Sequence, residues 1–324
     1  MKYPKWLTVA GIAASILFID AAKSSAGVFT SKRVETTPEQ YYAYSQPREL
    51  VKNLRKYEQN LSCHNSPDEA NLTHYQVWLN RGVALQQYEK YRESIVCLDR
   101  ALSLQNDLEQ AWYRRGIALS YLKEYSQAVF AYEQAIKLDP TEHTSWYNQG
   151  NAYKHLEQYN QAIAAYERAI ALKPDFHAAY YQMAKVLEIT GKYKRAIAGY
   201  QKATYLNPDY YQAWYAQANL MSKLEQYDKA INVYQKILKQ QSEQYKAWYN
   251  LGNIYLQIEE YEKAIAAYER AISLKPDYHL AWNNRGAALE ALKQTKEALK
   301  SYGKALQVNP DYEKALNNRL RLLL

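Results

Sequence analysis

The side chains of this sequence that could carry catalytic chemistry are its six histidines, its two cysteines and scattered carboxylates. His143, His177 and His279 recur at the first position of a 34-residue unit, so the repeat accounts for them without chemistry. His155 stands alone. No serine, cysteine or carboxylate set stands at catalytic spacing, and no glycine-rich phosphate loop or Cys/His zinc cluster is present. The sequence therefore predicts a protein that is not an enzyme and that carries no cofactor or metal.

The two cysteines offer one redox reaction. Cys63 precedes the repeated region, and Cys97 lies within its first unit. In an exported protein two cysteines can form a disulfide, so Cys63 and Cys97 are a candidate pair. The alternative is that Cys97 is a small buried residue.

The elements that position these side chains repeat every 34 residues. One large aromatic residue marks the same place in each unit: Trp78, Trp112, Trp146, Tyr180, Trp214, Trp248 and Trp282. A glycine or alanine follows four residues later, and an alanine and a tyrosine recur in the second half of most units. A fixed period in this range is the signature of stacked repeats.

Each unit reads as two antiparallel helices. In residues 146–153 and again in residues 162–170, small or apolar side chains recur at i, i+4 and i+7, which is one face of a helix. Glycine inside a helix costs about 1 kcal/mol relative to alanine, so its periodic use indicates close packing. We expect the aromatic ladder to be buried in this packing. Most units close with Pro-Asp, and we expect the aspartates to cap the next helix. These aspartates are Asp175, Asp209, Asp277 and Asp311.

The recurring Trp, Gly, Tyr, Ala and Pro resemble the tetratricopeptide repeat family. The resemblance covers seven units: 75–108, 109–142, 143–176, 177–210, 211–244, 245–278 and 279–312. It implies an all-α fold, a right-handed superhelical solenoid of antiparallel helix pairs with helical caps. Residues 47–74 are the expected N-terminal capping helix and loop, and residues 313–324 the C-terminal capping helix. The fifth unit departs from the pattern at Ile237 and Ser242, where we expect a longer helix or a softer bend.

The same resemblance implies that the first helix of each unit lines a concave groove. The candidate groove residues are Tyr113, Tyr147, Tyr181, Tyr215, Tyr249, Asn148, Asn151, Asn219, Asn250, Asn253 and Asn284. Tyrosine offers a broad apolar face with a polar tip, and an asparagine amide can both donate to and accept from a peptide backbone. These residues therefore suit an extended peptide. The alternative is that they serve helix packing and solubility.

The charge distribution does not favour other ligands. The formal net charge is +8, but opposite signs alternate along the helices, which is typical of solvated faces. Nucleic-acid binding would need a concentrated basic patch. Members of the resembled family that bind chaperone tails use a carboxylate clamp of Lys, Asn and Arg residues spread over three successive units. This sequence lacks that set, because tyrosine stands at the position of the first lysine, so a carboxylate-clamp role is not expected. We therefore predict a scaffold that binds an extended segment of a partner protein, as an adaptor or complex-assembly factor.

The alternative function is a structural module that associates with itself or with a membrane through its array ends. Leu322, Leu323 and Leu324 would either fold back onto the last unit or form such a contact.

The first residues have the layout of a secretory signal. Lys2 and Lys5 precede the apolar run 7–19, and small residues follow up to Ala26. The apolar run is shorter than the roughly 20 residues of a membrane-spanning helix, although an N-terminal membrane anchor is the alternative. We predict a signal peptide at 1–26 and a linker at 27–46. The predicted location is exported, that is periplasmic, lumenal or extracellular.

Overall fold

The computed structural model describes residues 74–324. The predicted signal peptide, the linker, residues 47–73 of the predicted cap and Cys63 lie outside the described residues. The described part divides into two compact units, residues up to Thr141 and residues from Glu142 onward, which are treated separately below.

The described residues form helices and no strand. The first helices of the repeats are α3 (Tyr75–Gln87), α5 (Glu109–Tyr121), α7 (His143–His155), α9 (His177–Ile189), α11 (Tyr211–Lys223), α13 (Tyr245–Gln257) and α15 (His279–Ala291). The second helices are α4 (Tyr91–Leu104), α6 (Tyr125–Leu138), α8 (Tyr159–Leu172), α10 (Tyr193–Leu206), α12 (Tyr227–Gln240), α14 (Tyr261–Leu274) and α16 (Thr295–Val308). One further helix, α17 (Glu313–Leu323), ends the chain.

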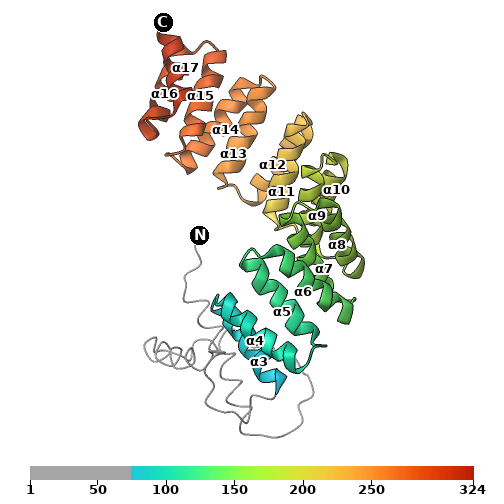
Figure 1. The fold of residues 1–324 in the computed structure, drawn as a ribbon. Coiled ribbons are helices and arrows are strands. Elements are labelled where there is room, and N and C mark those ends of the chain that lie inside the picture. The colour runs from blue at the N-terminus through green and yellow to red at the C-terminus, as the bar shows by residue number, and fades with distance from the viewer. Residues whose placement is uncertain (1–73) are drawn as a thin grey trace, which may run out of the picture. The chain divides into compact units, whose positions relative to one another are not determined.

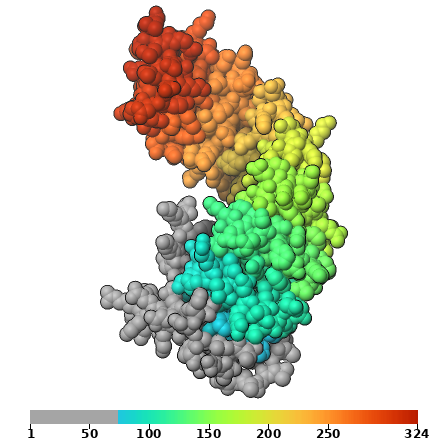
Figure 2. Space-filling model, viewed as in Figure 1, coloured from blue at the N-terminus to red at the C-terminus, as the bar shows by residue number. Residues whose placement is uncertain are grey.

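Each first helix packs against the second helix of its own repeat, and within each compact unit that second helix packs against the first helix of the next repeat (Figure 1). Residues up to Thr141 hold two such pairs, and residues from Glu142 hold five pairs and α17. In the space-filling view, the pairs of residues 142–324 follow one another from green to red in direct contact (Figure 2). The expected all-α solenoid of helix pairs is confirmed.

The innermost aromatic residues are tyrosines of the second helices. Their side chains are 0–1% exposed, and they are Tyr132, Tyr166, Tyr200, Tyr234, Tyr268 and Tyr302. Of the aromatic ladder on the first helices, only Trp78 is buried, and the others are half-buried. The prediction that the ladder fills the core was therefore wrong for most of its members.

The tryptophans of the ladder tie each repeat to the loop before it. The indole Nε1 of Trp112, Trp214, Trp248 and Trp282 donates to a backbone carbonyl six residues earlier, at 2.8–2.9 Å. A ring that must reach this carbonyl stays at the edge of the helix pair, so it remains partly exposed. The ladder therefore fixes the joint between repeats, while the tyrosines fill the space inside them.

Glycine on the first helix makes room for these tyrosines. A Cβ added at Gly150 or Gly252 would lie 2.7 Å from the ring of Tyr166 or Tyr268, closer than real Cβ atoms approach. The close packing predicted from the periodic glycines is therefore present, and its partner is the tyrosine ring. In the repeat where Ala184 replaces glycine, the small residue stands on the second helix instead, as Gly199.

The expected aspartate caps are absent. The N-cap residues of α9, α11, α15 and α17 are aromatic and make no side-chain cap hydrogen bond. Asp175 and Asp209 stand one residue before these N-cap positions, where their backbone carbonyls accept from the first helical N–H instead. Spacing alone placed the caps one residue too early in the chain.

At the fifth repeat the structure excludes the longer helix, and the softer bend stays a prediction. Helix α12 ends at Gln240 with the same 14-residue length as the other second helices, so no longer helix forms there. At the chain end, Leu322 packs near Leu289 and Tyr302, whereas Leu323 and Leu324 are exposed. The predicted fold-back therefore holds for one of the three leucines.

Candidate functional site

The first helices of residues 142–324 form one continuous face, which we call the first-helix face. Side-chain hydrogen bonds join neighbouring first helices along it: α7 to α9, α11 to α13, α13 to α15 and α15 to α17. Four of the candidate tyrosines and all of the candidate asparagines lie on these helices. The fold therefore brings these residues onto one surface.

The candidate tyrosines are half-buried, and three of them contact an aromatic ring on each of two sides. The ring of Tyr181 lies 5.8 Å from the buried Tyr200 and 5.0 Å from Tyr210, which closes the same repeat. Tyr147 and Tyr249 make the equivalent two contacts. Such rings present a fixed aromatic edge to solvent, because their rotamers are set by their neighbours.

Burial also raises the pKa of several tyrosines on or beside this face. It raises the pKa of Tyr215 to about 12, and it raises the pKa of Tyr210 and Tyr278 to about 12 as well. It raises the pKa of Tyr181 too. The hydroxyls of Tyr181 and Tyr215 therefore remain neutral hydrogen-bond donors throughout the physiological pH range.

The asparagines have a structural task that the sequence did not reveal. The Oδ1 atoms of Asn151 and Asn253 accept from the buried hydroxyls of Tyr166 and Tyr268, both at 2.8 Å, and Asn219 accepts from Tyr234 in the same way. A buried hydroxyl without a partner is costly, so these amide oxygens stabilise the core.

In repeats without an asparagine at this position, a side chain one turn further along the first helix forms the hydrogen bond with the buried tyrosine hydroxyl. Glu188 accepts from Tyr200, and Glu290 accepts from Tyr302, both at 2.7 Å. Ser120 lies 3.2 Å from the hydroxyl of Tyr132. Every buried tyrosine hydroxyl among the described second helices thus has a partner on its own first helix. The sequence already showed this alternation: a repeat has either an asparagine at the position of Asn151 or a polar residue three positions later.

The amide nitrogens remain the part of the asparagines that could meet a peptide. Asn250 and Asn284 donate to Tyr234 and to Asn253 of the preceding repeat, at 3.0 and 2.8 Å. Asn151 and Asn253 use only their oxygens in hydrogen bonds with described residues. Asn148 is half-buried on α7. The asparagines therefore serve packing, as the alternative interpretation held, and still offer donors at the surface.

Replacing Asn253 by alanine should destabilise the protein by about 1–3 kcal/mol, because the buried hydroxyl of Tyr268 loses its acceptor. The same substitution in a Tyr268→Phe background should cost less, since no hydroxyl is left to satisfy. Urea unfolding of the four proteins gives the coupling energy. Equal costs of Asn253→Ala in both backgrounds would show that the bond does not hold the core.

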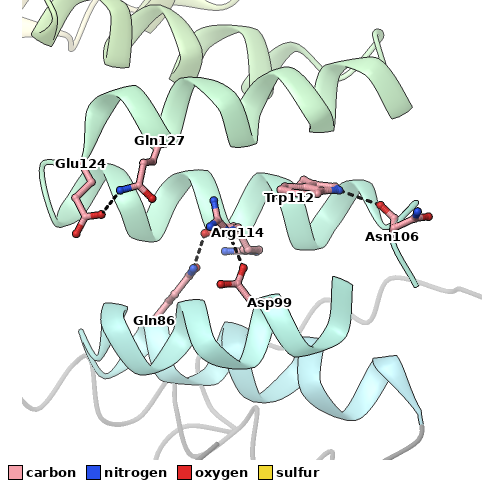
Figure 3. Close-up of polar contacts among 8 residues, drawn as sticks. Gln86, Asp99, Asn106, Trp112, Arg114, Glu124 and Gln127 are labelled. Atoms are coloured by element: carbon pink, nitrogen blue, oxygen red, sulfur yellow. Dashed lines mark hydrogen bonds and ion pairs between the residues drawn. The ribbon is translucent and has the colours of Figure 1, made fainter. Parts of the chain in front are cut away.

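Tyr113 belongs to the unit that ends at Thr141. Its ring lies 6.2 Å from that of Tyr132, and the guanidinium of Arg114 lies 6.0 Å from its centroid. Figure 3 shows how neighbouring first helices are joined there: Gln86 donates to the backbone oxygen of Arg114 at 2.7 Å. Trp112 reaches the carbonyl of Asn106 in the same view. Tyr113 thus occupies the same position in its repeat as Tyr147 does in the next.

Family models of the tetratricopeptide repeat match residues 75–108, 109–142, 143–176, 165–198, 200–232, 245–278 and 279–312. The chain belongs to the tetratricopeptide repeat family. No curated protein matches the sequence.

Solved tetratricopeptide repeat proteins share the fold. The C-terminal part of one from Cytophaga hutchinsonii is 16% identical with a TM-score of 0.67, over 74% of this chain and 98% of that one. One from Parabacteroides merdae is 14% identical with a TM-score of 0.53, over 77% of this chain and 99% of that one. YrrB is 21% identical with a TM-score of 0.51, over 59% of this chain and 99% of that one. At these identities the likeness shows the fold alone.

The histidines at the first repeat position pack against aromatic rings. His143 meets Phe176 edge-on at 5.1 Å, and His279 meets Tyr312 at 4.9 Å. Within residues 74–324, no three His, Cys, Asp or Glu side chains gather as metal ligands would. No helix in this part of the chain is long and apolar enough to span a membrane.

Cys97 lies on α4 and is fully buried. Among the described residues there is no free cysteine. Its candidate partner, Cys63, lies outside the described residues, so the bridge between them stays a prediction.

Proposed function

We propose that the chain is a protein-interaction scaffold whose first-helix face holds an extended segment of a partner protein. The observation that carries this proposal is the row of half-buried tyrosines on α7, α9, α11 and α13, together with hydrogen-bonded asparagines on α7, α11, α13 and α15. Side chains of this kind can contact a peptide backbone irrespective of its sequence, because an amide nitrogen donates to any carbonyl. The rings are already ordered, so binding loses little side-chain entropy.

The family supports the same direction. Tetratricopeptide repeats are generally non-catalytic protein-binding scaffolds, and YrrB is described as a tetratricopeptide repeat protein with an unusual peptide-binding site. A role as an exported adaptor or assembly factor rests on the segment 1–26 and remains a prediction. The alternative, self-association or membrane contact through the array ends, rests on the exposed leucines of α17, such as Leu316 and Leu320.

A long charged side chain introduced on the first-helix face should block binding. Ala216 is half-buried on α11 between the candidate tyrosine and asparagine positions, whereas Ala198 is exposed on the second helix α10. We expect Ala216→Glu to weaken binding of a peptide selected from a random display library at least about tenfold, which is about 1.4 kcal/mol. Ala198→Glu, with the same change of charge, should leave the affinity unchanged.

The affinity is measured by fluorescence anisotropy with the full chain, and circular dichroism verifies that both variants remain helical. Equal affinities for the two variants would argue against the first-helix face as the binding surface. Failure to select any peptide from the library would contradict the proposal outright.

A further inference from the structure

Two lysines meet at the junction of α7 and α9 on the first-helix face. The Nζ atom of Lys154 donates to Oε1 of Gln182 at 2.9 Å, which bridges the two helices. Lys185 lies one helical turn after Gln182 on α9, and its Nζ atom is 5.7 Å from the ring centroid of Tyr181. Lys154 is half-buried, and Lys185 is exposed. Both ammonium groups therefore lie beside the aromatic and amide groups to which the proposed function assigns the peptide.

Neither lysine forms an ion pair with a described residue. The carboxylate nearest in sequence to Lys185 is Glu188, which accepts from the hydroxyl of Tyr200. The one nearest to Lys154 is Glu157, and neither carboxylate forms an ion pair with these lysines. On the second helices of the same two repeats, by contrast, Arg195 pairs with Glu167 at 2.9 Å. Lys154 and Lys185 thus lack an ion-pair partner among the described residues.

The electrostatic environment agrees with two neighbouring cations. Burial lowers the pKa of Lys154, and the positive charge of Lys185 lowers it further. The pKa of His155 is lowered by burial and then by the charges of Lys154 and Lys185. A half-buried ammonium that faces a second one is unfavourable, and an incoming anion would relieve both the desolvation and the repulsion.

The equivalent positions on the neighbouring first helices do not carry the same charge. On α11 and α13, the positions equivalent to those of Gln182 and Lys185 carry Ala216, Asn219, Asn250 and Asn253, which are uncharged. At α15, Glu290 is bound by Arg321 at 2.7 Å and by Tyr302. The amide stretch of α11 and α13 is thus neutral at these positions, whereas Lys246 and Lys275 place further cations beside the ring of Tyr245, at 6.0 and 5.0 Å.

We propose that Lys154 and Lys185 form a subsite for an acidic side chain of the bound partner segment, so that the scaffold selects an acidic peptide. This inference rests on the proposed function, because the same face must hold the rest of the segment. Adjacent positions on α11 and α13 would then contact the uncharged residues that flank the acidic side chain.

The test uses the full chain and the fluorescein-labelled peptide selected from the random library, together with a copy in which every Asp and Glu is changed to Asn and Gln. The acidic peptide should bind the wild type roughly fivefold more tightly than its amide copy, as expected for about one well-placed ion pair. In the variant Lys154→Gln/Lys185→Gln, this difference should disappear. The control Lys194→Gln/Lys202→Gln removes the same charge from exposed positions of α10 and should keep the difference.

Each outcome decides between the two claims. If the acidic peptide and its amide copy bind the wild type equally while Ala216→Glu still blocks both, the lysine subsite is wrong and the peptide-binding face stands. If Ala216→Glu blocks neither, the proposed function fails. Because Lys185 is exposed, Lys185→Gln alone provides a second variant that should fold normally. An unchanged preference for the acidic peptide in that variant and in the double variant would overturn the subsite.

Discussion

Replacing Gly252 by alanine should destabilise the protein by about 1–3 kcal/mol, the usual cost of overpacking a core. The same change in an ordinary helix would stabilise it by about 1 kcal/mol, because alanine is the better helix former. The reversal follows from the ring of Tyr268, which lies 2.7 Å from the place of the new Cβ and is fully buried. Either the ring or the whole helix pair must move.

Gly303 provides the matched control. It lies inside α16, and nothing stands within 4 Å of an added Cβ. Gly303→Ala should therefore stabilise the protein by about 0.5–1 kcal/mol. Urea unfolding of the two variants measures both effects. If both substitutions shift the midpoint in the same direction, the glycine does not have the packing role described for it.

The fifth repeat shows how the fold tolerates the larger residue. Ala218 stands at the glycine position there, opposite the buried Tyr234, and α11 and α12 pack less extensively than the other pairs do. This looser packing is what a methyl group at the glycine position would require. In a repeat that has glycine at this position, a change to alanine would push the two helices apart, although the residues around them are packed for a closer approach.

Raising the pH above 10 should unfold the protein. Burial raises the pKa of the second-helix tyrosines well above their ordinary value of about 10, as for Tyr166, Tyr234 and Tyr268. The folded state therefore keeps protons that the unfolded chain releases above pH 10. Their contribution to stability is complete below pH 10 and is lost as the pH rises beyond it. Between pH 10 and pH 11, each buried tyrosine should lower the free energy of unfolding by about 1 kcal/mol, so the six together should lower it by about 6 kcal/mol.

The measurement is the urea midpoint at pH 8, 9, 10 and 11, with tyrosinate absorbance followed in parallel. Lysine deprotonation also falls in this range, so the decisive comparison is between variants. Changing Tyr166, Tyr234 and Tyr268 to phenylalanine should remove about half of the tyrosine contribution to the pH dependence. Tyr205→Phe should change nothing, because that side chain is 77% exposed. Identical pH profiles for the two variants would contradict a buried, protonated tyrosine core.

Much of the fold could be predicted because the repeat imposes the same constraint seven times. The spacing of Trp, Gly and Tyr indicated two helices in each unit, and the glycines indicated close packing. Periodicity did not reveal which aromatic lies innermost. Trp214 has an indole N–H that must find an acceptor, and the carbonyl of Pro208 draws the ring to the edge of the pair. The hydroxyl of Tyr234 can instead be satisfied from within the repeat.

The sequence indicated which helices carry the candidate residues, but not the hydrogen bonds that these residues form. The positions of Tyr181 and Asn253 on the first helices followed from the repeat register. The bond between Asn253 and Tyr268 did not, because it joins residues fifteen positions apart on different helices. The lysine subsite was missed for a similar reason: Lys154 and Lys185 occupy different positions in their repeats and come together only when α7 and α9 pack.

Photo-crosslinking tests the peptide-binding face most directly. A benzoylphenylalanine replaces Tyr181 on the first-helix face in one protein, and in another it replaces Tyr205 on the second helix α10, both in the full chain with the library-selected peptide. We predict a peptide adduct from position 181 and none from position 205. An adduct from position 205 with none from position 181 would contradict the account, because the peptide would then lie on the second helices.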